Sequence, residues 1–178
     1  MRPLRIPFVV PLAAMTAVVV LSNWLVQFPI NALLTWGAIT YPISFLITDL
    51  TTRLHGPDRA RRIVWLGFAV AVLLSAWLAT PRIAAASGTA FLVGQLLDIQ
   101  LFQKLRDGSW WRAPLVSSSV GSVADTVMFF TLAFAGSDLP WVTLALGDLG
   151  VKLLLAVLAL APFRAVLALA LPLPPVRT

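Results

Sequence analysis

The sequence has no cysteine and no glutamate, and it has one histidine among its 178 residues. Without cysteine, the chain can form no disulfide, no thiolate metal site and no thiol nucleophile. The single histidine, His55, falls in a predicted loop, so a zinc motif such as HExxH is excluded. Charge is also scarce, because 11% of the residues are charged where a soluble domain carries roughly 25%. We therefore expect no metal, no cofactor and no enzymatic activity.

Hydrophobic residues make up 60% of the chain, and the mean hydropathy is +0.93. So few charges could not keep the surface of a soluble domain wet, and the sequence predicts an all-α integral membrane protein with one domain over residues 1–178. The pI of about 11.4 comes mainly from arginine. Because these arginines flank apolar segments, membrane topology explains them better than a nucleic-acid partner does.

Six segments are apolar enough to cross a bilayer as helices of about 20 residues. Turn and breaker residues such as Pro29, Gly56, Pro81 and Pro140 separate them. The first segment resembles a signal peptide but lacks a clear cleavage site, so we interpret it as a retained span. The six segments are residues 8–28, 34–53, 63–80, 83–103, 115–134 and 141–160.

Lysine and arginine are distributed very unevenly between the two sides that six spans would create. Arg82 is the only one on the far side, and Lys152 lies within a span. Basic residues in short loops mark the cytoplasmic side, so both termini are predicted to be cytoplasmic. The near side holds Arg2, Arg5, Arg53, Arg59, Arg61, Arg62, Lys104, Arg106, Arg112, Arg164 and Arg177.

Four aspartates, Asp49, Asp98, Asp125 and Asp148, lie within or at the rim of these segments. A charge at the bilayer centre costs about 2.5–3.5 kcal/mol on insertion scales, so such residues usually face a bundle interior and mark a site for a substrate, an ion or a proton. Asp125 lies at the centre of its segment, with no cation within its own helical turn. It is the strongest candidate. Asp98 comes next, because Gln95 one turn earlier can present an amide beside it.

Structural roles also fit several of these residues. Asp148 and Lys152, one turn apart, can neutralise each other as a structural or proton-coupling pair. Asp49 can pair with Arg53 of its own helix. Asn23 and Gln27 can serve as hydrogen-bonding contacts between helices, and Ser118, Gly121 and Ser122 as small packing residues.

The second segment contains Gly37 and Pro42 in its first half. Proline removes a backbone hydrogen bond, and broken helices at membrane depth are tolerated where they line a cavity. This pattern fits either a simple kink or a binding site. The third segment, 63–80, lacks a strongly polar residue, so we expect it to face lipid.

The chain resembles the queuosine-precursor transporter family, within the vitamin uptake transporter group, over about residues 20–165. Single motifs would be weak, but their order along the chain is specific. After Pro162 the match thins. The matching stretches are Leu34-Thr-Trp-Gly, Thr40-Tyr-Pro, Phe45-Leu-Ile-Thr-Asp49, Arg61-Arg62, Gly67-Phe68, Ala86-Ser-Gly-Thr-Ala-Phe91-Leu, Gln95, Asp98, Trp110-Trp111, Ser117-Ser118, Gly121-Ser-Val-Ala-Asp125-Thr, Phe129-Phe130 and Lys152.

The resemblance implies a bacterial inner-membrane importer of 7-cyano- and 7-aminomethyl-7-deazaguanine. A carboxylate can accept both N–H donors of a guanine-like edge, so we expect Asp98 and Asp125 to hold the base. The amide of Gln95 or Asn23 would donate a hydrogen bond to the carbonyl of the base. Stacking of a base on an aromatic ring is worth about 1–3 kcal/mol in other proteins. The aromatic candidates are Trp36, Tyr41, Phe45, Phe91 and Phe129.

Three other functions fit parts of the sequence. A substrate-capture subunit of an energy-coupling-factor vitamin importer is also small and six-helical, and Ala13-x-x-x-Ala17 could dock it on a partner. A scaffold without transport is a second alternative. An enzyme would need aspartates from different segments to form a protease-like dyad. Two copies of the chain could pair through the third segment as a homodimer.

Overall fold

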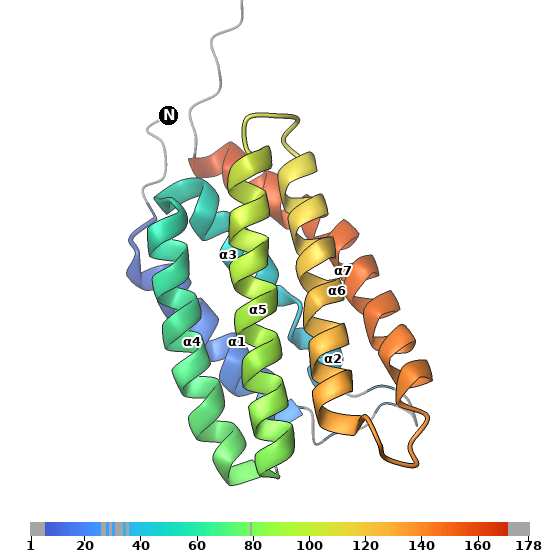
Figure 1. Cartoon of the computed structure of the whole chain (residues 1–178). Helices are drawn as coiled ribbons and strands as arrows, with labels where there is room; N and C mark the ends of the chain where they lie inside the picture. The colour runs from blue at the N-terminus through green and yellow to red at the C-terminus, as the bar shows by residue number, and fades with distance from the viewer. Residues whose placement is uncertain are drawn as a thin grey trace, which may run out of the picture.

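The computed structural model describes residues 6–25, 28, 30, 34, 36–78 and 80–170, and within these every regular element is a helix (Figure 1). The predicted helical class is therefore confirmed, while Gln27 lies outside the described residues. The second segment is divided in two, and the last helix continues to Ala170. The helices are α1 (Val9–Leu25), α2 (Trp36–Thr40), α3 (Ile43–His55), α4 (Pro57–Leu78), α5 (Pro81–Leu105), α6 (Arg112–Phe134) and α7 (Trp141–Ala170).

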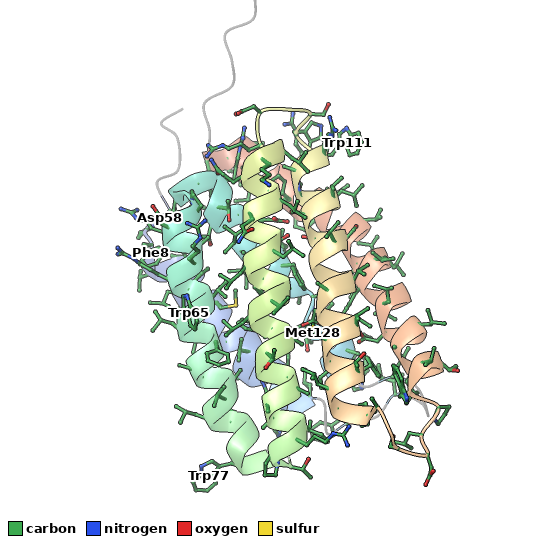
Figure 2. All side chains as sticks on the ribbon, in the orientation of Figure 1. Phe8, Asp58, Trp65, Trp77, Trp111 and Met128 are labelled. Carbon is green, nitrogen blue, oxygen red and sulfur yellow. The ribbon has the colours of Figure 1, made fainter. Side chains whose placement is uncertain are left out.

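The long helices run up and down a common axis, with α2 and α3 packed between them (Figure 1). The α3–α4 and α5–α6 turns lie at one end of the bundle, and the α4–α5 and α6–α7 turns lie at the other. Figure 2 places Asp58 and Trp111 together at the first end and Trp77 at the opposite end. The arginine-rich turns therefore share one end, as the sequence predicts.

The exterior of the bundle is apolar. Helices α5, α6 and α7 are long and apolar enough to cross a membrane, and α1 is a shorter apolar helix. As expected for the third segment, α4 exposes Trp65, Leu73 and Trp77. The last helix is more open still, because only 11% of its most apolar stretch is buried and residues such as Leu146 point outward.

Two glycines bring α5 and α6 into close contact. A Cβ atom on Gly121 would lie 2.9 Å from the carbonyl oxygen of Gly94, and one on Gly94 would lie 3.0 Å from the carbonyl oxygen of Gly121. Small residues let membrane helices approach in this way. The contact also brings two aspartates near the helix crossing, since Asp98 lies beside Gly121 and Asp125 beside Gly94.

Gly121→Ala is expected to lower the stability of the bundle by about 1–3 kcal/mol, the usual cost of overpacking. The new methyl group would meet the Phe45 ring at 2.8 Å as well as the Gly94 backbone, so the helices must separate. Thermal unfolding in detergent measures the change. Gly147→Ala is the matched control, because nothing lies within 4 Å of its added carbon. Equal midpoints for the two variants would contradict this account of the crossing.

The chain breaks between α2 and α3 at Tyr41 and Pro42. Proline has no N–H to donate, and the turn is closed instead by bonds from the Ser44 N–H to the Tyr41 carbonyl at 2.9 Å and from the Phe45 N–H to the Pro42 carbonyl at 3.1 Å. The predicted irregularity is thus confirmed. The break also lets the Tyr41 side chain turn toward α6, where its hydroxyl forms a hydrogen bond.

Candidate functional site

A group of charged and polar side chains lies buried between α6, α7 and the turn that follows α2. The Lys152 ammonium donates to Asp125 Oδ2 at 2.6 Å and pairs with Asp148 Oδ2 at 2.5 Å. It also donates to Thr126 Oγ1 at 3.0 Å, and Thr126 donates to Asp148 at 2.9 Å. The Tyr41 hydroxyl completes the set with a 2.8 Å bond to Asp125 Oδ1. We call these five residues the lysine cluster.

One ammonium in this cluster faces two carboxylates. Asp125 and Lys152 are 3% and 5% exposed, so water screens their interaction little. The predicted pair of Asp148 and Lys152 is confirmed. Asp125 has no cation within its own helical turn, as the sequence indicates, but Lys152 reaches it from a different helix, which spacing along α6 could not reveal.

A second buried group joins α3, α5 and α6. Ser117 Oγ donates to Asp49 Oδ1 at 3.2 Å, and Ser118 Oγ donates to Asp49 Oδ2 at 2.9 Å. Ser118 also lies 3.4 Å from Asp98 Oδ1. The other oxygen of Asp98, Oδ2, is buried and has no hydrogen-bond partner among the described residues. We call these four residues the carboxyl pair cluster.

The proposed pairing of Asp49 with Arg53 is wrong. Asp49 is buried and faces the serines of α6, whereas Arg53 lies one turn further and donates to the carbonyl oxygen of Arg106 at 2.8 Å. The interpretation of Ser118 as a packing residue misses its hydroxyl, which is a main donor to this carboxylate. The serine pair at one end of α6 is the sequence signal for it.

Gln95 is fully buried and its amide is engaged by α3. Its Nε2 donates to Ser44 Oγ at 2.8 Å, and its Oε1 accepts from Thr48 at 2.6 Å. Gln95 and Asp98 do share a face of α5, as predicted. In this conformation, however, the amide joins two helices and is not turned toward an open site.

The predicted aromatic residues divide into two sets. The ring of Tyr41 packs edge-on near Phe45 and Phe91, with centroids 6.5 and 6.3 Å away. Trp36 is about half exposed, and Phe129 packs instead against its neighbours on α6.

Asn23, the other predicted amide, donates to the Val19 carbonyl of its own helix at 2.8 Å. The contacts described for Trp36, Phe129 and Asn23 include no member of either cluster, whereas Tyr41 belongs to the lysine cluster and Phe45 and Phe91 pack beside it.

A narrow crevice connects the two clusters. Asp49, Ser118 and Lys152 line it together with apolar residues of α3 and α7, including Phe45 and Phe163. Its volume is about 10 Å³, which holds about one water molecule. A ligand as large as a purine would need α7 to move away from α3. We call this arrangement, in which the crevice is too small for a purine-sized ligand, the closed conformation.

An apolar helical exterior around buried charges is the arrangement by which membrane transport proteins handle polar cargo. The comparison with known families agrees. The family whose model is described as "Putative vitamin uptake transporter" matches residues 35–80 and 75–167, and the chain belongs to this family. The family resemblance read from the sequence is thus confirmed.

Curated relatives cover most of the chain. An Escherichia coli (strain K12) protein named "Queuosine precursor transporter" is 37% identical over 84% of this chain and 81% of its own length. A Haemophilus influenzae protein named "Probable queuosine precursor transporter" is 34% identical over 82% of this chain and 79% of its own length. A Bacillus subtilis protein of the same name is 28% identical over 57% of each chain. No solved structure matches.

Proposed function

We propose that this protein imports the queuosine precursors 7-cyano-7-deazaguanine and 7-aminomethyl-7-deazaguanine across a bacterial inner membrane. The names of the relatives support this substrate class. The chain would cross the membrane six times, with α2 and α3 together forming one crossing. Both termini would be cytoplasmic, because the arginine-rich turns share one end of the bundle and Arg82 lies at the other.

The single observation that carries the binding site is the environment of the Asp125 carboxylate. One oxygen accepts from the Tyr41 hydroxyl and the other from the Lys152 ammonium. A guanine-like edge presents two N–H donors side by side, and these can replace the two protein donors. Lys152 can leave Asp125 without losing all of its partners, since Asp148 and Thr126 also hold it.

The rings around Tyr41 would form the walls of this site. Phe45 and Phe91 are both 2% exposed and pack beside Tyr41, so a flat heterocycle admitted next to Asp125 meets aromatic faces. Asp98 and Gln95 belong to other hydrogen-bonded groups in the closed conformation. In this proposal they do not contact the base directly.

The test is uptake by the purified protein in lipid vesicles. Vesicles that contain the protein should take up labelled 7-cyano-7-deazaguanine, and empty vesicles should not. An excess of unlabelled 7-aminomethyl-7-deazaguanine should compete strongly, and guanine more weakly. No uptake of either precursor by correctly inserted protein would reject the substrate assignment and favour the scaffold alternative.

One observation favours the second candidate, a substrate-capture subunit. Ala13 and Ala17 are both exposed on α1, one turn apart, so a partner helix could approach this face closely. Purification from native membranes separates the two functions. Association with a coupling subunit and ATPases would support the capture subunit, whereas uptake by the protein alone would support the independent importer.

A further inference from the structure

The carboxyl pair cluster has no role in the binding site proposed above. Asp49 and Asp98 are 2% and 0% exposed, and both lie close to the Ser118 hydroxyl, at 2.9 and 3.4 Å. Neither forms an ion pair with any residue in the described ranges. Two carboxyl groups are thus held together in a low-dielectric interior without a counter-charge.

The hydrogen-bond donors of this cluster are directed unequally. Ser117 and Ser118 each have one hydroxyl proton. Ser117 donates to Asp49 at 3.2 Å, and Ser118 donates to Asp49 at the shorter of its two contacts, 2.9 Å. Ser118 approaches Asp98 only at its longer contact of 3.4 Å to Oδ1, and Asp98 Oδ2 has no hydrogen-bond partner within the described part of the chain. A buried carboxylate without donors is very costly, whereas a protonated carboxyl can donate to a neighbouring carboxylate.

Two cations on the surrounding helices, Lys152 and Arg53, are engaged elsewhere. Lys152 of α7 lines the same crevice as Asp49 but is bonded to Asp125 and Asp148. Arg53 of α3 donates to the Arg106 carbonyl. Helices α1 and α2 have no titratable side chain within their bounds, and the charged residues of α4 lie in its first two turns. Asp125 of α6 accepts hydrogen bonds from Tyr41 and Lys152.

We propose that Asp98 and Asp49 share one proton and that this proton is the coupling ion for uptake. The inference rests on the transport function proposed above. A proton would bind to Asp98 from the outer side together with the base and leave to the cytoplasm, so each cycle moves one proton and one unaltered substrate inward. No covalent bond of the substrate changes.

The location of the pair suits coupling to the substrate site. Asp98 packs against Gly121 and Asp125 against Gly94, so both groups lie at the same α5–α6 crossing. The crevice that touches Asp49 also touches Lys152. A change of charge on the pair therefore acts on the helix contact that positions Asp125, the carboxylate proposed to bind the substrate.

The experiment uses vesicles that contain the full-length protein. Exchange of labelled for unlabelled 7-cyano-7-deazaguanine without any gradient tests the transport function alone. A pH gradient of one unit, acidic outside, should then drive accumulation of up to about tenfold for one proton per substrate. An uncoupler should abolish this accumulation, and a pH-sensitive dye inside the vesicles should report acidification when substrate is added.

Asp98→Asn mimics the protonated form and should remove both the accumulation and the substrate-induced acidification. Asp58→Asn is the control, because Asp58 is 85% exposed at the arginine-rich end of the bundle and should couple normally. If Asp98→Asn inserts poorly, Ser118→Ala removes a donor of the same cluster and should reduce the accumulation and the acidification. Infrared spectra of the purified protein at neutral pH should contain a protonated-carboxyl band that Asp98→Asn removes, with or without substrate.

Several results would overturn the inference. Exchange without any effect of the pH gradient would reject proton coupling while leaving the transport function intact. Accumulation driven by a sodium gradient would assign the cluster to another ion. Absence of the infrared band would show that the pair carries no proton. Absence of exchange would reject the transport function instead, which keeps the two failures distinct.

Discussion

Asp125→Asn is expected to reduce uptake of labelled 7-cyano-7-deazaguanine about 100-fold or more. A carboxylate can accept both N–H donors of the base, whereas an amide offers one acceptor and turns its own N–H toward the second donor. Hydrogen bonds to a charged group contribute about 1.5–3 kcal/mol each, and 1.4 kcal/mol corresponds to a factor of ten. Initial rates of uptake in vesicles, normalised to the amount of inserted protein, give the measurement.

The same substitution should leave the protein folded. Lys152 would still pair with Asp148 at 2.5 Å and still donate to Thr126, so no buried cation loses all of its partners. Thermal stability in detergent should therefore stay near that of the wild type, and Asp58→Asn should take up substrate normally. Wild-type uptake by Asp125→Asn would refute the role given to this carboxylate.

Lys152→Met is expected to destabilise the folded protein by about 3–5 kcal/mol, the usual cost of removing one partner from a buried ion pair. The methionine fills much of the same space, so lost charge and not a cavity dominates the effect. Asp125 and Asp148 would then face each other without a cation in the interior. The unfolding midpoint in detergent and the yield of inserted protein measure the loss.

A second substitution distinguishes charge from packing. Lys152→Met combined with Asp125→Asn removes one of the two stranded carboxylates, so we expect it to recover a large part of the lost stability. Asp125 is the better choice for this rescue because its side chain is 5% exposed, against 17% for Asp148. If the double variant is no more stable than Lys152→Met alone, the ammonium is not needed to balance Asp125.

The sequence predicts well the contacts that depend on local spacing. Hydropathy locates the long helices, and the four-residue interval between Asp148 and Lys152 predicts their ion pair. The Gly37 and Pro42 pattern predicts the break in the second segment. Such inferences succeed because a helix or a turn is determined largely by its own residues.

Local spacing in the sequence does not predict the contacts between helices. The bond from Lys152 to Asp125 joins α7 to α6, and its direction depends on how the two helices rotate against each other. The same holds for Asp49, which has a cation one turn away on its own helix yet faces serines of α6. Phe129 is a sequence candidate because it follows Asp125 by one turn, but its ring packs with neighbouring phenylalanines.

The bonds of Lys152 join α7 to α6 and stabilise the closed conformation of a transporter that has no substrate bound. If α7 moves outward, the ammonium moves with it. The Asp125 carboxylate then remains in the apolar interior with the Tyr41 hydroxyl as its one donor from the lysine cluster. Only cargo that brings its own N–H groups can make up that loss. Protein without bound substrate would therefore seldom open, and solutes would not leak through it across the membrane.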